Sequence, residues 1–408
     1  MSDAEIARSA ATAQEPSRIV IGRRRVFVLC CGFVMMLFTG LIYAWSIFAS
    51  PLEKEFGWDR GQTSLVFTIS MSVSILGQIF GGFLVSRRRQ GLALRLASLF
   101  LLVGFVKASR VTSLAGLYVA YGGISGFGVG ICYNVILATV IGHFPDRVGL
   151  ASGLMLMSFG LGSLILGSVA TSLIVSFGWR VAFLALALGF ALVVLLGSFI
   201  VTAPAAETSK KSSTGAAPLD MVRRLEYVKF FFWCTLMNSA GLLILGHAAT
   251  CALDLNATLR MAGLSAGIIS IFNGASRLMY GQIYDRSGFR TLAFVAGALY
   301  FMATLGMAFA YLTGRLWLLF IAFGILGLAY GAGPIGASTY VKERFGMRYY
   351  GVNLGITNLN IVIASFAGPF LAGLLRARFA SYMPAFGLML IFIAASFLLA
   401  LGLQGRRS

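Results

Sequence analysis

The chain has 408 residues, of which 59% are hydrophobic and 11% charged. A soluble domain carries about 45–50% apolar and about 25% charged residues, so the composition excludes an ordinary soluble enzyme and indicates a chain solvated by lipid. The net charge of +19 does not indicate a nucleic-acid-binding protein, because the basic residues lie in short clusters between apolar runs.

Twelve apolar segments are expected along the chain, each long enough to cross about 30 Å of hydrocarbon as a helix. In the first half they cover residues 26–50, 62–85, 91–109, 113–142, 150–174 and 180–203. A polar stretch, 204–226, is typical of a linker. In the second half they cover residues 227–253, 262–284, 290–311, 315–341, 350–374 and 378–403. The predicted fold is all-α and membrane-embedded, with six-helix bundles over 26–203 and 227–403 and tails at 1–25 and 404–408.

Basic clusters predict the orientation in the membrane. They lie in both tails, in the linker, and after the second, eighth and tenth segments: Arg18, Arg23, Arg24, Arg25, Arg87, Arg88, Arg89, Lys210, Lys211, Arg223, Arg224, Arg286, Arg290, Lys342, Arg344, Arg348, Arg406 and Arg407. Cytoplasmic loops carry the excess of lysine and arginine, so we expect both termini in the cytoplasm of an inner-membrane protein. The polar first 20 residues predict no cleavable signal peptide. The five cysteines indicate neither a disulfide framework nor a metal site.

The two halves repeat each other. Gly82-Phe-Leu-Val-Ser86-Arg87 follows the second segment, and Gly281-Gln-Ile-Tyr-Asp285-Arg286 follows the eighth, at an offset of 199 (285 minus 86). Gly149-Leu-Ala-Ser-Gly153 and Gly351-Val-Asn-Leu-Gly355 repeat at an offset of 202 (351 minus 149). A nearly constant offset indicates a duplicated, pseudo-two-fold fold, in which transporters place the substrate site between the halves near the bilayer midplane.

The segment from Gly281 through Asp285 and Arg286 to Arg290 resembles the signature loop of the major facilitator superfamily. This resemblance implies a twelve-helix transporter that works by alternating access, with Gly281, Asp285, Arg286 and Arg290 as its gating loop. In the first half Ser86 replaces the aspartate, which weakens the charge latch expected there.

Within that superfamily the chain is similar to the oxalate–formate antiporter and monocarboxylate transporter branch. The similar segments are Tyr43-Ala-Trp-Ser-Ile-Phe-Ala-Ser-Pro51, Gly128-Val-Gly-Ile-Cys-Tyr133, Phe144-Pro-Asp-Arg147 and Asn273-Gly-Ala-Ser-Arg277. The branch implies that Arg277 binds the substrate, and it favours a bacterial L-lactate transporter of the monocarboxylate type.

Arg277 is the one basic residue predicted to lie well inside a segment. It stands eight residues before Asp285, about 12 Å into the helix at 1.5 Å per residue. Burial there costs at least about 2.5–3.5 kcal/mol, and none of the 13 acidic residues lies in mid-segment to neutralise it. An anionic ligand held by the guanidinium fork explains such a residue; an arginine that snorkels or caps backbone carbonyls is the alternative.

The repeat gives Arg277 a neutral counterpart, Gln78, so the chain offers one cation for one carboxylate. The oxalate–formate antiporters have a second cation in the eleventh segment, where this chain has Thr357. Asn273 lies one turn before Arg277 on the same helix face, and it orients the guanidinium, bonds a substrate hydroxyl, or forms an ordinary interhelical bond. The animal monocarboxylate transporters usually have a titrating aspartate in its place.

His247 is the one histidine within a predicted segment, opposite Ser46 in the repeat. Since histidine titrates near neutral pH, it is the candidate for proton coupling, and a neutral, hydrogen-bonded histidine is the alternative. His143, at the end of the fourth segment, is interpreted as structural. Tyr43, Tyr133 and Tyr330 are expected to line the pocket as apolar walls with one hydroxyl each, with Asn134 beside Tyr133 as a weaker candidate.

These features predict a monomeric, proton-coupled symporter of a small monocarboxylate, L-lactate first and pyruvate second, without cofactor or metal. An anion exchanger, such as oxalate for formate, is the first alternative, and Thr357 argues against it. A transporter-derived sensor would need a soluble output domain larger than the 204–226 linker. A pump for apolar drugs would not need Arg277. No nucleophile–base pair, metal cluster or phosphate loop indicates an enzyme.

Overall fold

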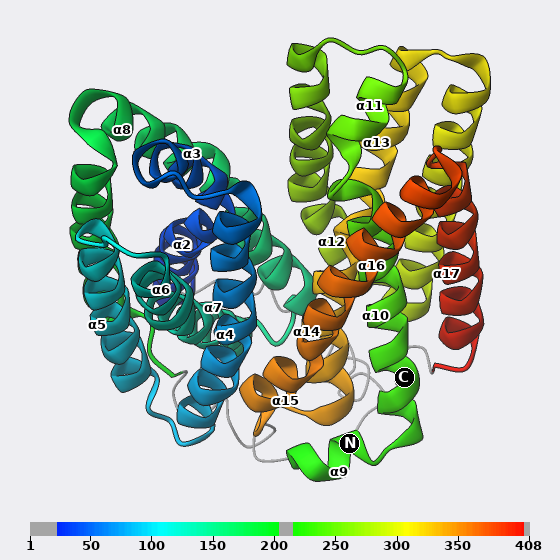
Figure 1. Ribbon diagram of the computed structural model, residues 1–408. Coiled ribbons are helices and arrows are strands. Elements are labelled where there is room, and N and C mark those ends of the chain that lie inside the picture. Colours follow the sequence, from blue (N-terminus) through cyan, green and yellow to red (C-terminus); the bar gives the residue numbers. More distant parts are fainter. Residues whose placement is uncertain (1–22, 204–214, 404–408) are drawn as a thin grey trace, which may run out of the picture.

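The protein is described by a computed structural model that covers residues 23–203 and 215–403, and within these residues every regular element is helical (Figure 1). The predicted tails up to residue 22 and from 404 onward lie outside the described residues. So do Lys210 and Lys211 of the linker. One isolated β-bridge joins Gly215 to Gly346.

Nine helical elements lie in residues 23–203 of the first half. They are α2 (Arg23–Thr39), η1 (Gly40–Ala44), α3 (Trp45–Phe56), α4 (Arg60–Ser86), α5 (Gln90–Ser109), α6 (Leu114–Leu117), η2 (Tyr118–Ser125), α7 (Gly126–His143) and α8 (Val148–Ile200).

The second half follows a short helix in the linker, α9 (Pro218–Val222). Its elements are α10 (Leu225–Leu245), α11 (Ala248–Asp254), α12 (Leu259–Thr313), α13 (Leu316–Tyr330), α14 (Ala332–Phe345), α15 (Tyr350–Thr357), α16 (Leu359–Phe379) and α17 (Met383–Leu401).

These elements form the twelve predicted spans. Ten apolar helices are long enough to cross a membrane within the described ranges. Two of them hold two crossings each: α8 has 53 residues and α12 has 55, and about 80 Å of straight helix would exceed the roughly 30 Å hydrocarbon core. Both reverse at a non-helical glycine, Gly178 and Gly288.

Several spans differ from the continuous helices that the hydropathy pattern predicts. The first continues to Phe56 rather than ending at residue 50, because Gly57, with φ 69°, provides its left-handed C-cap. The first span also contains a 3₁₀ turn (η1), and the fourth contains a π-helix (η2). The seventh span breaks at His247 and the eleventh at Asn358. Such breaks depend on local hydrogen bonding, which average hydropathy does not report.

The end of the linker is attached to the second half. The Ala216 amide donates to the Phe345 carbonyl at 2.9 Å, and the Asn353 side chain donates to the Ala216 carbonyl at 3.1 Å. The predicted linker therefore includes a docked, partly helical portion.

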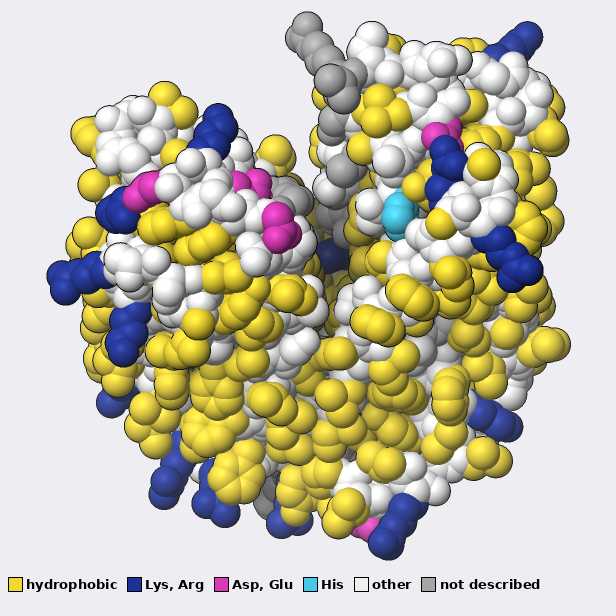
Figure 2. Space-filling model, viewed as in Figure 1, with side chains coloured by type: hydrophobic (Ala, Val, Ile, Leu, Met, Phe, Trp, Pro, Cys, Tyr) yellow, Lys and Arg dark blue, Asp and Glu magenta, His cyan; other side chains and the backbone are white. Residues whose placement is uncertain are grey.

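The two halves touch at one end of the molecule and separate at the other. We name the end that carries α9 and α15 the closed end, and the end that carries α3 and α11 the open end (Figure 1). Figure 2 shows a deep notch between the halves at the open end.

Paired glycines permit the contact at the closed end. A Cβ atom at Gly281 would lie 2.3 Å from the Gly149 carbonyl oxygen, and one at Gly82 would lie 2.2 Å from the Gly351 carbonyl carbon. The repeated glycines predicted from the sequence thus bring α12 against α8 and α4 against α15.

Gly288 generates the first prediction. Its φ of 76° and ψ of −174° fall in a region that is essentially restricted to glycine and costs other residues about 1–3 kcal/mol. Gly288→Ala should lower the melting temperature of the purified protein. Gly387→Ala, a helical site with open space for a Cβ, is the matched control. Equal melting temperatures for both variants would contradict this account of the turn.

Candidate functional site

A cavity lies between the two halves at the level of Arg277. About 510 Å³ of space free of protein atoms lies there, a volume that includes solvent at its open side. Both halves contribute to its wall, which consists of Ile42, Tyr43, Met71, Ser74, Gln78, Val129, Gly130, Tyr133, Leu156, Phe159, Arg277, Pro334, Asn358 and Ile361.

Arg277 is the charged residue of this wall. Its side chain projects from α12 and is only 4% exposed. Nη1 donates to the Leu156 carbonyl of α8, in the opposite half, and Nε has no hydrogen-bond partner among the described residues. No acidic side chain in the described ranges forms an ion pair with it.

A buried arginine without a counter-ion is energetically unfavourable unless its donors are satisfied. The Leu156 carbonyl accepts from Nη1, as expected for an arginine that caps a backbone carbonyl. The Nε donor has no partner among the described residues. A carboxylate that enters the cavity can accept two parallel hydrogen bonds from the fork.

Gln78 faces the cavity from α4 in the first half. Its Oε1 accepts a hydrogen bond of 2.6 Å from the Asn358 Nδ2, at the break between α15 and α16. The sequence reasoning identified Gln78 but missed Asn358. The repeat held the missing signal, because Asn358 is the counterpart of Leu156 at the 202 offset: Gln78–Asn358 and Arg277–Leu156 are equivalent contacts between the halves.

Two of the three predicted tyrosines line the cavity. Tyr43 and Tyr133 both contact Phe159 edge-on, with ring centroids 5.2 and 5.0 Å apart. Tyr330 is partly buried and does not belong to the lining residues. It packs closely against Gly241, and it lies near enough to Arg277 and Tyr43 to interact electrostatically with both. Phe159, which the sequence reasoning did not single out, is the ring that joins the two lining tyrosines.

The two predicted asparagines lie outside the cavity wall. Asn273 is partly buried, and its Oδ1 has no partner among the described residues. Asn134 donates from Nδ2 to the Gly351 carbonyl at 2.7 Å, a contact between the halves at the closed end. Its position beside Tyr133 in sequence suggested a pocket residue, but neighbouring residues on a helix point in different directions. The substrate-binding role of Asn134 has no support from the cavity.

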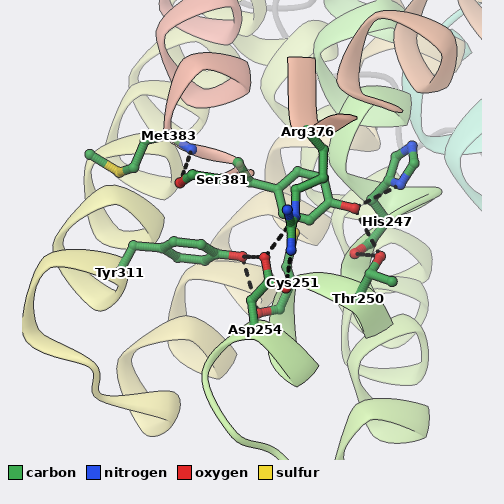
Figure 3. A network of polar contacts seen from close by, with 9 residues as sticks. His247, Thr250, Cys251, Asp254, Tyr311, Arg376, Ser381 and Met383 are labelled. Carbon is green, nitrogen blue, oxygen red and sulfur yellow. Dashed lines mark hydrogen bonds and ion pairs between the residues drawn. The ribbon is translucent and has the colours of Figure 1, made fainter. Parts of the chain in front are cut away.

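His247 also lies outside the cavity wall, at the break between α10 and α11 (Figure 3). Nε2 contacts the Pro369 carbonyl at 3.0 Å, and Nδ1 contacts the Tyr382 hydroxyl at 3.0 Å. Nε2 can donate to the Pro369 carbonyl, and Nδ1 can accept from the Tyr382 hydroxyl only when that hydroxyl turns its one hydrogen away from Thr250. His143 is buried, with Nδ1 at 2.9 Å from the Thr139 carbonyl.

An ion pair joins the same network near the open end. Arg376 Nη2 lies 2.8 Å and Nε 3.0 Å from the two carboxylate oxygens of Asp254, and Tyr311 donates to Asp254 at 3.4 Å. Tyr382 bonds Thr250 as well as His247, so the network connects α11, α12, α16 and the start of α17 (Figure 3).

Asp285 closes the opposite end. Its carboxylate accepts hydrogen bonds from the amides of Gly149 at 2.7 Å and Leu150 at 2.8 Å. These amides begin α8 in the other half, where the helix dipole favours negative charge. The equivalent Ser86 hydroxyl donates to Phe83 in its own helix, so the aspartate latch forms on one side of the repeat.

The two arginines of the signature segment differ in their contacts. Arg290 donates to the carbonyls of Leu403 at 2.9 Å and Leu401 at 3.1 Å, which anchors the end of α17. Arg286 is exposed. Arg290 therefore joins α12 to the end of α17, and its role in gating stays a prediction.

The sequence matches a family model described as Major Facilitator Superfamily over residues 28–369. The oxalate:formate antiporter of Oxalobacter formigenes is 25% identical over 339 residues, covering 81% of each chain. Monocarboxylate transporter 12 of Mus musculus is 33% identical over 147 residues, which are 36% of this chain and 30% of that one.

Solved structures share the fold. The E. coli fucose:proton symporter superimposes with a TM-score of 0.71 at 14% identity, covering 93% of this chain and 99% of that one. A proton:xylose symporter gives 0.68 at 16% identity, covering 92% and 94%.

The Asp285 latch generates the second prediction. Asp285→Asn keeps an acceptor but removes the charge at the α8 N-terminus, which should weaken the closed end by about 0.3–2 kcal/mol. Spin labels at Arg89 and Arg286, both exposed near that end, should gain a longer-distance population by pulsed EPR.

Asp220→Asn, an exposed carboxylate on α9, is the control for the loss of one charge. A distance distribution in Asp285→Asn that matches the parent protein would show that the latch does not hold the halves together.

Proposed function

The chain belongs to the Major Facilitator Superfamily, and from this premise we propose that it is a proton-coupled symporter of small monocarboxylates. The proposed substrates are L-lactate first and pyruvate second, and the proposed location is the inner membrane with both termini in the cytoplasm. The observation that carries the proposal is Arg277, a buried guanidinium that lines a cavity between the halves and has no ion-pair partner among the described residues.

One cation favours one negative charge. Arg277 is the only charged side chain in the described cavity wall. Thr357, where the oxalate–formate antiporters have a second cation, is fully buried and donates to the Asn353 carbonyl at 2.8 Å. It therefore offers neither charge nor a free hydroxyl hydrogen to a second carboxylate, and a dianion would be left half-paired.

The contact between Arg277 and Leu156 suggests how binding is linked to movement. The guanidinium joins α12 of one half to α8 of the other. A carboxylate that takes over the Nη1 donor would release this contact, and the halves would then be held by fewer bonds. Differential binding of this kind is what shifts a conformational equilibrium.

The open end would face the exterior. Lysine and arginine side chains gather along the rim of the closed end (Figure 2), as the excess of basic residues on the cytoplasmic side requires. At the open end Arg180 and Arg376 are paired with Glu55 and Asp254. In this orientation the cavity is open to the outside, and Asp285 closes the cytoplasmic side.

The coupled proton has two candidate carriers, His247 and the substrate. His247 lies outside the cavity wall, so its protonation would act on the external ends of α10 and α11 and would not neutralise Arg277 directly. Protonation would make Nδ1 a donor to the Tyr382 oxygen, which would fix the Tyr382 hydroxyl hydrogen on Thr250.

An anion exchanger is the second candidate function. The relative that supports it is the oxalate:formate antiporter of Oxalobacter formigenes, similar over 81% of the chain. Exchange needs a site that binds both anions, and the single cation of this cavity fits formate better than oxalate.

Purified protein in liposomes separates the two functions. A proton gradient, acidic outside, should drive accumulation of labelled L-lactate without any internal anion. Arg277→Lys should reduce uptake by at least tenfold, because an ammonium group does not reproduce the bidentate fork. His247→Gln should retain lactate exchange but lose accumulation driven by the gradient if His247 carries the proton.

Accumulation that requires internal formate or oxalate and ignores the proton gradient would replace symport by exchange. Undiminished lactate uptake by Arg277→Ala would remove the basis of the whole proposal. If His247→Gln still accumulates lactate in response to the proton gradient, the substrate and not His247 carries the coupled proton.

A further inference from the structure

The contact between Gln78 and Asn358 leaves hydrogen-bonding capacity directed at the cavity. Gln78 is 7% exposed and Asn358 is 3% exposed, and both line the cavity together with Arg277. One bond of 2.6 Å joins them, from Asn358 Nδ2 to Gln78 Oε1. In the described parts of the chain, neither the Gln78 Nε2 donor nor the Asn358 Oδ1 acceptor has a partner, and neither atom is sealed from solvent.

A neighbouring amide pair shows what a purely structural contact looks like in this protein. Asn360 accepts from Asn238 at 2.7 Å through Oδ1 and donates through Nδ2 to the Thr357 carbonyl. Both ends of the Asn360 amide are used within the second half, away from the cavity wall. The Gln78–Asn358 pair differs in three respects. It joins the two halves, it lines the cavity, and it has one donor and one acceptor without a partner in the described parts of the chain.

One donor beside one acceptor matches a hydroxyl group. A hydroxyl accepts one hydrogen bond and donates another, whereas a ketone oxygen only accepts and a methylene does neither. A site built to bond a hydroxyl rejects analogues that lack it, since its own buried polar groups then stay unpaired.

The repeat relates this pair to the cation. Gln78 and Arg277 are equivalent residues of α4 and α12, at an offset of 199 (277 minus 78), and both line the same cavity. The rest of the wall is mostly apolar, with Ile42, Met71 and Phe159 among its residues. The cavity therefore offers a carboxylate position, a separate neutral polar position and room for a small alkyl group.

We infer that Gln78 and Asn358 form a hydroxyl subsite, so that the cavity selects short 2-hydroxymonocarboxylates over the 2-oxo and unsubstituted acids of the same length. The carboxylate is bound by Arg277, and the 2-hydroxyl donates to Asn358 and accepts from Gln78. This inference rests on the proposed function and adds the substrate's second anchor, which ranks lactate above pyruvate and propionate.

Competition for labelled lactate uptake into proteoliposomes tests the subsite. In the parent protein, unlabelled lactate should compete at least about tenfold better than propionate, since each neutral hydrogen bond contributes about 1 kcal/mol and 1.4 kcal/mol is tenfold. Pyruvate should lie between them. In Gln78→Met and in Asn358→Leu, the ratio of lactate to propionate should fall toward one while propionate still competes.

Two further variants keep the test specific. The double variant Gln78→Asn with Asn358→Gln retains one donor and one acceptor and should restore part of the ratio. Ser70→Ala, buried on α4 outside the cavity wall, should leave the ratio unchanged.

A purely structural contact predicts a different pattern. If the pair only holds the halves together, its loss changes the affinity for lactate, pyruvate and propionate by one common factor, and an unchanged ratio overturns the inference. Equal competition by lactate and propionate in the parent protein also overturns it, while the proposed function stands. If none of the three acids competes with or enters through the parent protein, the proposed function itself fails.

Discussion

The buried guanidinium of Arg277 needs hydrogen-bond acceptors or a negative charge, and the structure around it depends on this need. Arg277 sits between two halves of a membrane protein with one carbonyl partner and an unfilled Nε donor. Transferring such a group from water is unfavourable unless charge or hydrogen bonds compensate it, and no carboxylate within the described ranges does so. A small anion that enters from water would supply the missing partner. This explains why the cavity opens to one side of the molecule and why the other half contributes neutral residues to its wall.

The duplicated scaffold arranges the remaining contacts in matching layers. Arg277, Gly281 and Asp285 follow one another at four-residue intervals on α12 and face α8, as a stripe on one helix face does. Gln78, Gly82 and Ser86 repeat the same spacing on α4, where Gln78 contacts Asn358 and Gly82 contacts α15. In each stripe a polar cavity contact is followed by a glycine contact. In the third layer the halves differ: Asp285 accepts two amides of the opposite half, whereas Ser86 bonds within its own helix. The residues proposed to bind the substrate and the residues that join the halves at the closed end therefore lie on consecutive turns of the same helices.

The sequence predicted the features that depend on composition and repetition. Hydropathy predicted twelve spans, and the repeat predicted a duplicated fold of two related halves. Arg277 was recognisable because a charge within an apolar segment is costly and rare. The sequence did not reveal what depends on how the halves meet. Asn358 became a cavity residue through a helix break and a contact with Gln78, 280 positions away in the chain. The contact of Asn134 with Gly351 in the other half was not visible for the same reason, and its substrate-binding role stays a prediction. The proton role of His247, which lies outside the cavity wall, stays a prediction.

The central claim is that this cavity holds one singly charged carboxylate on Arg277, and calorimetric titration of the purified protein tests it most directly. The account predicts one lactate bound per chain, weaker binding of oxalate than of lactate at a pH where oxalate is doubly charged, and loss of both heats in Arg277→Met. Lactate binding that persists in Arg277→Met, or a dianion that binds more tightly than the monoanion, would contradict it.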